Sequence, residues 1–244
     1  MIPSQIKFPT GNAMIGLVSP TRRHFAAAAL LCLGLFTPAA VAEVSLPNVF
    51  SDHMVLQRRQ ANKVWGKASP GEKIVVTIGT QSHEATAGAD GAWQVTLSPM
   101  EAGAPVKLVA KGPANEVAVA DVLVGEVWIC SGQSNMRASL GDIYDSDLEI
   151  AAANHPEIRM INYPSVGAQK PSWTHANARW IVSTPQTARS FSAVGYIFAR
   201  QIHESLGVPV GIINNAWAGS RAEAWVPRKH FRRPGESAAD RGPL

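Results

Sequence analysis

The residues Gly132-Gln133-Ser134-Asn135 combine a tight turn with a hydroxyl group that can do chemistry. A serine hydroxyl attacks esters when a neighbouring base accepts its proton. The stretch from Val122 to Cys130 is apolar and rich in β-forming residues, as in a strand buried on both faces within a parallel sheet. A Gly-x-Ser turn after such a strand predicts that Ser134 reaches the crevice where open α/β sheets bind ligands. On the local pattern alone, ordinary turn and N-cap residues are the commoner explanation.

The segments after Asp121 are those expected to position this serine. Apolar strands are predicted at 158–162 and 208–213, with a polar, tryptophan-containing loop at 163–191 and a helix at 192–206 between them. Gly207 is expected to end the helix. The predicted apolar face of the helix consists of Val194, Ile197, Phe198, Ile202 and Leu206. Strand, helix and strand in this order predict a parallel sheet.

Residues 44–120 follow a different pattern, with short β-forming runs separated by turn signals. A turn at 69–72 precedes an expected strand at 74–78. The sequence Ala89-Asp90-Gly91-Ala92 is typical of a β-hairpin. Further strands are predicted at 93–97, 106–110 and 116–120. Such spacing is typical of a small antiparallel β-sandwich or jelly-roll-like module, and no catalytic constellation is visible in it.

The first 42 residues have the pattern of a cleavable export signal. Positive charge at 21–25 precedes an apolar stretch at 26–36 and a small-residue cleavage site at 40–42. The apolar stretch is short for a membrane span, which takes about 20 residues, so no membrane anchor is expected after cleavage. The pair Arg22-Arg23 fits a twin-arginine signal as well as an ordinary one. The protein is therefore expected in the periplasm or outside the cell.

Charge and cysteine content exclude several classes of protein. The formal net charge is +4, and part of it comes from the export signal and from a basic cluster at 228–233. No basic stripe indicates nucleic-acid binding, and neither repeats nor metal-ligand spacing are found. The chain has two cysteines, of which Cys32 would leave with the signal. Cys130 is then expected to be a buried, unreactive thiol rather than half of an intrachain disulfide.

Four blocks of sequence, in order between about residues 44 and 227, resemble the sialate O-acetylesterase family. They are Phe50-Ser-Asp-His-Met-Val-Leu-Gln-Arg58, Val124-Gly-Glu-Val-Trp-Ile-Cys-Ser-Gly-Gln-Ser-Asn-Met136, Phe191-Ser-Ala-Val-Gly-Tyr-Ile-Phe-Ala-Arg200 and Gly211-Ile-Ile-Asn-Asn-Ala-Trp-Ala-Gly-Ser-Arg-Ala-Glu-Ala-Trp225. The resemblance implies an SGNH-type three-layer α/β/α hydrolase. It also implies removal of O-acetyl groups from sialic acid or another acetylated carbohydrate through an acetyl-Ser134 intermediate, without a metal or other cofactor.

The resemblance also implies an oxyanion site. The Ser134 amide is expected to be one donor, at the start of a helix, and the loop Trp217-Ala218-Gly219-Ser220 the second. The family usually has glycine where Ala218 stands, so the donor would be misaimed if positive φ is needed there. Further oxyanion or substrate contacts are expected from Gln133, Asn135, Asn215, Glu223 and Trp225. For Trp217 and Trp225, core packing and a sugar pocket remain equal alternatives.

The catalytic base is the part of the family pattern that this sequence lacks. The family carries a Gln-Gly-Glu block and a C-terminal Asp-x-x-His, and neither occurs here. The histidines after Ser134 are without the expected partner: His155, His175, His203 and His230. The interpretation is a β-rich module at 43–120, a partial esterase domain at 121–227 and an unrelated, disordered tail at 228–244 left by a frameshift or early stop. The alternative function is a catalytically dead fragment or a non-catalytic sugar-binding remnant.

Overall fold

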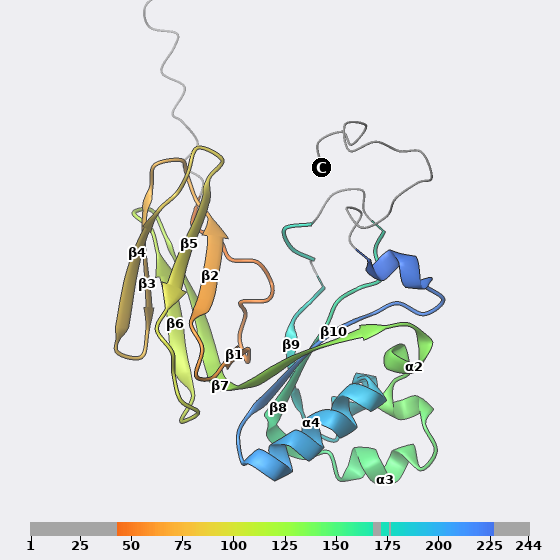
Figure 1. Ribbon diagram of the computed structural model, residues 1–244. Coiled ribbons are helices and arrows are strands. Elements are labelled where there is room, and N and C mark those ends of the chain that lie inside the picture. The colour runs from red at the N-terminus through yellow and green to blue at the C-terminus, as the bar shows by residue number, and fades with distance from the viewer. Residues whose placement is uncertain (1–42, 168–171, 176, 227–244) are drawn as a thin grey trace, which may run out of the picture. The chain divides into compact units, whose positions relative to one another are not determined.

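A computed structural model describes residues 43–167, 172–175 and 177–226 (Figure 1). The expected export signal and the expected tail at 228–244 lie outside these residues. Within the described part of the chain, no helix is both long enough and apolar enough to cross a membrane.

Ten strands and a few short helices make up the described fold. The strands are β1 (Val55–Gln57), β2 (Asn62–Lys67), β3 (Lys73–Ile78), β4 (Gln81–Thr86), β5 (Ala92–Leu97), β6 (Val106–Lys111), β7 (Glu116–Gly132), β8 (His155–Asn162), β9 (Trp180–Ser183) and β10 (Val210–Ala216). The α-helices are α2 (Ser134–Arg137), α3 (Ser146–Ala151) and α4 (Ala193–Leu206). Single 3₁₀ turns are η2 (Leu140–Asp142), η3 (Ala188–Ser190) and η4 (Ala222–Trp225).

Most of the strands belong to one mixed sheet of eight strands. Its order is β4-β3-β6-β7-β10-β8-β9, and β1 also pairs with β7. The predicted parallel arrangement is found where β10 lies between β7 and β8. β9, in the region expected to be a loop, pairs antiparallel with β8, so the sheet is not parallel throughout. The carboxyl ends of β7, β10 and β8 therefore meet at one edge.

β7 is a single strand where two were expected. The runs at 116–120 and 122–130 are joined through Asp121, whose φ of 52° is unusual for a residue with a side chain. The first part of β7 pairs with β6 and the last part with β10. One strand thus connects the β-rich region with the α/β region (Figure 1).

The predicted hairpin around Asp90-Gly91 is wrong. Gly91 does turn the chain, with φ of 73°, but β4 pairs with β3 and β5 pairs with β2. The turn therefore carries the chain from the large sheet to a separate two-stranded sheet. Between the two sheets lies an apolar core with contributions from Val64, Ile74, Val76, Trp93, Leu97 and Leu108. The core, rather than the turn signal, decides which strands pair.

Helix α4 has the predicted length, but the face it buries is different. Ser192 is its N-cap and Gly207 its C-cap. The buried residues are Ala193, Gly195, Tyr196 and Ala199, while most of the predicted apolar face is exposed: Val194, Ile197, Phe198 and Leu206. Small residues let the helix approach the sheet closely. The face of α4 with small residues is therefore buried, although the predicted face is more hydrophobic.

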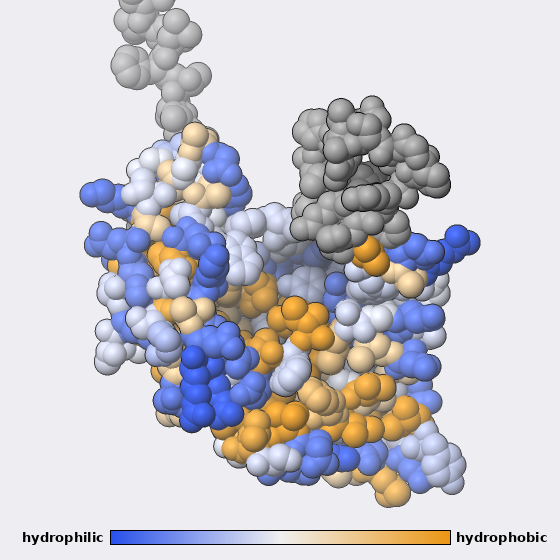
Figure 2. Space-filling view, in the orientation of Figure 1, coloured by the Kyte–Doolittle hydropathy of each residue, from blue (hydrophilic) through white to orange (hydrophobic). Residues whose placement is uncertain are grey.

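The end of β7 is also less buried than predicted. Trp128 and Ile129 keep 43% and 70% of their surface exposed. The reason is topological, because β1 stops opposite Gly125 and no other described strand covers that side of β7 beyond this point. Trp128 packs edge-to-face on Phe198, with ring centroids 5.1 Å apart. Apolar side chains accordingly gather at the surface over β7 and α4 (Figure 2).

Candidate active site

Ser134 is exposed and begins α2, one residue after β7 ends. The turn depends on Gly132, whose φ of 138° is unfavourable for any residue with a Cβ atom. The Trp217 amide donates a hydrogen bond to the Gly132 carbonyl at 2.8 Å. This bond holds the loop after β10 against the turn that carries Ser134.

The hydroxyl of Ser134 is bonded to its neighbour and not to a base. Its Oγ donates to Oε1 of Gln133 at 3.0 Å, and its amide donates to the same oxygen at 3.4 Å. Rotation of the Gln133 side chain would free both donors. Helix α2 has only four residues, so the helix dipole adds little here and the amide itself must supply the oxyanion contact.

The structure answers whether the loop after β10 needs positive φ at Ala218. Gly219 takes positive φ, at 74°, and Ala218 does not. The alanine therefore causes no strain at the position where the family usually has glycine. Ala218 and Gly219 lie beside the Ser134 turn through the bond made by Trp217. Asn135, Asn215 and Glu223 are exposed at the same end of the sheet, without a described side-chain bond to Ser134.

Two asparagines that the sequence analysis missed lie in the cavity next to Ser134. The cavity has a volume of about 1350 Å³, and its lining includes Ser134, Asn162 and Asn214. Asn214 is 5% exposed and donates to Asn162 at 2.9 Å, and its own Oδ1 has no partner among the described residues. A buried amide oxygen without a partner is costly. The side chains of Asn214 and Asn162 together supply amide groups to the cavity lining.

Three arginines add positive charge to the cavity wall. Arg137, Arg179 and Arg189 line it. Arg189 forms an exposed ion pair with Asp147 at 3.3 Å, whereas Arg137 and Arg179 have no acidic partner among the described residues. The cavity therefore offers hydroxyl acceptors and cationic groups beside an accessible serine. No cluster of side chains suited to a metal ion occurs in the described ranges.

Residues 124–234 match the sequence profile of a family described as carbohydrate esterase, sialic acid-specific acetylesterase. Human sialate O-acetylesterase is 29% identical to the chain over 200 residues, which cover 72% of the chain and 37% of the human protein. The mouse enzyme is 27% identical over 223 residues, covering 83% and 41%. The crystal structure of a carbohydrate acetylesterase from Xanthomonas citri superposes with a TM-score of 0.73 at 39% identity, covering 75% of the chain and 42% of that structure.

The chain is therefore similar to the sialate O-acetylesterase family over the part that it shares with these proteins. It spans about two fifths of the length of the relatives it matches. The Ser134 turn and the loop after β10 both lie within the residues that match the family profile.

None of the described histidines bonds to Ser134. His155 and His203 lie at the amino end of β8, with ring centroids 6.3 Å apart, and so at the opposite end of the sheet. His175 packs on Tyr163 in the loop that follows β8. His230 lies outside the described residues. No hydrogen bond from a histidine to Ser134 is therefore found among the described residues.

One histidine–aspartate pair was overlooked because it precedes Ser134 in sequence. Nδ1 of His53 is 2.6 Å from Oδ2 of Asp121, and Nη1 of Arg159 donates to the same oxygen at 2.8 Å. Although burial alone would raise the pKa of Asp121, the hydrogen bonds from Arg159 and His53 lower it overall. Arg159 lies level with Val127 in the sheet, well before the end of β7. The pair thus joins the two regions of the protein, and His53 also lines the cavity that contains Ser134, without a described hydrogen bond to it.

Cys130 is buried, with 8% of its surface exposed, and it has no disulfide. Burial raises the pKa of its thiol. The thiolate is the reactive form, so this environment agrees with the expected unreactive role.

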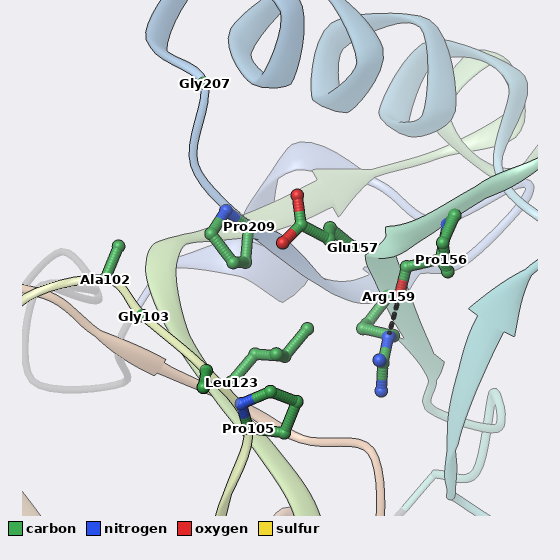
Figure 3. Close-up of a pocket in the computed structure, with 10 residues that line it drawn as sticks. Ala102, Gly103, Pro105, Leu123, Pro156, Glu157, Arg159, Gly207 and Pro209 are labelled. Carbon is green, nitrogen blue, oxygen red and sulfur yellow. Dashed lines mark hydrogen bonds between the residues drawn. The ribbon is translucent and has the colours of Figure 1, made fainter.

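A second cavity, of about 440 Å³, lies at the other end of the parallel strands (Figure 3). Pro156 and Glu157 begin β8, Pro209 precedes β10, and the loop with Pro105 closes the side. Arg159 donates from Nε to the Pro156 carbonyl at 2.7 Å (Figure 3). Ligands of open α/β sheets bind at the carboxyl ends of the strands. This cavity is therefore part of the junction between the two regions and not a candidate active site.

Proposed function

We propose that the protein is a serine esterase that removes O-acetyl groups from carbohydrates. The observation that carries this proposal is the exposed Ser134 in a glycine turn at the carboxyl end of β7, next to the loop Trp217–Ser220 and within the matched family profile. The human and mouse relatives are named sialate O-acetylesterases, and the Xanthomonas relative is a carbohydrate acetylesterase.

The proposed reaction proceeds through an acetyl-enzyme. The Ser134 oxygen attacks the acetyl carbonyl, its proton passes to a base, and the sugar leaves as the alcohol. The amides of Ser134 and of the loop at Ala218-Gly219 stabilise the oxyanion, and water then releases acetate. Since no described histidine bonds to Ser134, the base must come from outside the described contacts.

The cavity supports a sugar as the part of the substrate that carries the acetyl ester. Asn162 and Asn214, which are bonded to each other at 2.9 Å, line the cavity and supply polar groups for sugar hydroxyls. The unpaired Arg137 and Arg179 favour substrates with a carboxylate, such as sialic acids, over neutral acetylated sugars. A preference for acetylated neutral sugars in competition assays would remove this role for the arginines.

The same proposal includes the finer architecture and location. Strands β2–β6 with the first part of β7 would form an N-terminal β-sandwich, and the remainder an SGNH-type hydrolase domain. Export by the signal at 1–42 would place the enzyme in the periplasm or outside the cell, where acetylated glycans are met.

Acetate release tests the proposal directly. The purified chain is assayed with p-nitrophenyl acetate and an O-acetylated sugar, beside Ser134→Ala and the exposed control Ser98→Ala. Because Ser134 is the proposed nucleophile, Ser134→Ala should release no acetate above background, whereas Ser98→Ala should match the parent. Mass spectrometry of the quenched enzyme should find one acetyl group on Ser134. Equal rates for the parent and Ser134→Ala would contradict the proposal.

The second candidate is a sugar-binding protein without catalysis. It is favoured by one observation, the absence of a described base bonded to Ser134. In that case the parent chain binds acetylated sugars but releases no acetate above the Ser134→Ala level.

A further inference from the structure

Tryptophans are unusually exposed in this protein. The chain has seven, and five of them keep 36–43% of their surface accessible. Large exposed apolar groups that gather in one place mark binding surfaces. Four of the five lie on β2, in the loop before β9, in the loop after β10 and in η4: Trp65, Trp173, Trp217 and Trp225. The fifth, Trp128, lies elsewhere, against Phe198 on α4.

The route begins on the outer face of β2. Side chains alternate along a strand, so Trp65 and Lys67 share the outer face while Val64 and Gly66 point into the core. The buried Phe50 packs edge-to-face on Trp65, with ring centroids 4.6 Å apart, and fixes the orientation of its ring. Nζ of Lys67 lies 5.9 Å from the centroid of the Trp173 ring. Trp173 therefore continues the surface that Trp65 begins.

Trp173 lies in a loop that is anchored to the β-rich region. The Asn48 amide donates to Oγ1 of Thr174 at 3.1 Å, and Oγ of Ser172 donates to the Thr174 carbonyl at 2.7 Å. Nε1 of Trp180 donates to the Val49 carbonyl at 2.8 Å where the loop enters β9. These bonds hold Trp173 at the surface although its ring is not part of the core.

The same loop leads to the candidate active site. It starts at Tyr163, directly after β8, and Gly167 lies against Trp217, since a Cβ at Gly167 would be 3.6 Å from Cη2 of that ring. The Trp217 amide in turn bonds the turn that carries Ser134. Contacts thus connect the exposed face of β2 with Trp173, and Trp217 with the turn that carries Ser134, while residues 168–171, between Gly167 and Trp173, lie outside the described residues.

We propose that Trp65, Trp173 and Trp217 form a binding strip for an oligosaccharide of several sugar units, which extends from the acetyl ester at Ser134 to the outer face of β2. The flat apolar faces of sugar rings stack on indole rings, and successive tryptophans match successive sugars. Lys67 is already bonded to the carbonyl of Asp90 at 3.0 Å, so the strip offers mainly ring faces. Figure 2 shows a recess between β2 and the loop before β9, along this course. That the oligosaccharide runs toward Ser134 rests on the proposed function, whereas its binding to the tryptophans does not.

Binding is measured in the Ser134→Ala background, so that acetyl groups are not consumed. The probes are two series of increasing length, xylan-derived oligosaccharides and oligosialic acids, titrated by calorimetry. Affinity should rise with length in at least one series, and Trp65→Ala and Trp173→Ala should each weaken the longest probe roughly tenfold. Trp65→Tyr and Trp173→Tyr should keep most of the affinity. Trp128→Ala, an equally exposed tryptophan off the strip, should bind like the parent.

The outcomes separate this proposal from the proposed function. Affinity that does not depend on length in either series, or equal weakening by Trp128→Ala, overturns the strip. If one alanine variant fails to melt cooperatively, the other alanine variant decides, and an unchanged affinity of that variant for the longest probe overturns the strip too. Length-dependent binding without acetate release by the chain with Ser134 intact keeps the strip and removes the esterase. Acetate release by the chain, with tryptophan variants that bind the probes like the parent, keeps the esterase and removes the strip.

Discussion

At the scale of single residues, Asp121 combines an unusual backbone conformation with two side-chain partners. It has positive φ, it bonds to His53, and it pairs with Arg159, whose side chain is only 6% exposed. Asparagine tolerates the same backbone conformation, so Asp121→Asn removes the charge without adding strain. A buried arginine that loses its partner is costly. The role of Asp121 in stability can therefore be separated from its backbone geometry.

We expect Asp121→Asn to lower the free energy of unfolding at pH 7 by about 2 to 3 kcal/mol. Because the folded-state pKa of Asp121 is lowered, its contribution is complete above the unfolded-state pKa of about 3.9. It is lost as the pH falls through the folded-state value. Urea unfolding of both proteins between neutral and acidic pH should show the difference shrinking in acid. A difference independent of pH would show that charge is not its origin.

At the scale of elements, α4 supports the short helix that carries Ser134. Ser192 caps α4 by accepting from the Gly195 amide at 3.1 Å. Its hydroxyl also donates to the Met136 carbonyl of α2 at 2.7 Å. Ser192 is 1% exposed, so water cannot replace either bond.

Replacing the cap should therefore destabilise the protein. We expect Ser192→Ala to lower the free energy of unfolding by about 1 to 2 kcal/mol, measured by chemical denaturation. Ser205→Ala, at an exposed position in the same helix, should change it by less than about 0.5 kcal/mol. Similar values for the two variants would mean that the cap and its bond to α2 contribute nothing.

The uncovered end of β7 is the second feature at this scale. Unpaired edges with apolar side chains promote association, and a charge on the edge opposes it. We expect Ile129→Lys to reduce self-association in sedimentation and light-scattering experiments. Because Ile129 is 70% exposed, the cost in stability should stay within about 0.5 kcal/mol. Thr96→Lys adds the same charge on exposed β5 and should leave association unchanged. An equal reduction in self-association by both variants would show that net charge, and not the edge of β7, is its cause.

For the molecule as a whole, the matched relatives extend well beyond the part that this chain shares with them. A fusion after about Pro227 with the remaining part of the Xanthomonas relative should cover the open side of β7. We expect a higher melting temperature, slower solvent quenching of Trp128 fluorescence and a rise in esterase rate on the order of 10⁴-fold, the scale of supplying a base. Fusion to an unrelated domain of equal length serves as the control. The same gain in both fusions would refute the prediction.

Much of the local structure could be predicted from sequence, because its signals are local. The apolar run before Ser134, the cap residues Ser192 and Gly207, and the strands at β3, β5, β6, β8 and β10 were expected near where they occur. The pairing of β4 and β5 and the buried face of α4 were predicted wrongly. The pairing of a strand and the buried face of a helix both depend on which other elements pack against them, and no pattern within a single segment contains that information.

The sequence by itself determined the helix that ends at Gly207, several of the strands, the glycine turn that exposes Ser134 and the similarity to the sialate O-acetylesterase family, because these follow from the order and type of neighbouring residues. Only the tertiary structure brought Asn214 and Asn162 together in the cavity with Ser134, joined His53 and Arg159 to Asp121, and placed Trp173 beside Lys67 of β2. These residues are far apart in sequence. Their contacts arise from sheet register and from the packing of loops on two sheets, which are set by the whole fold at once.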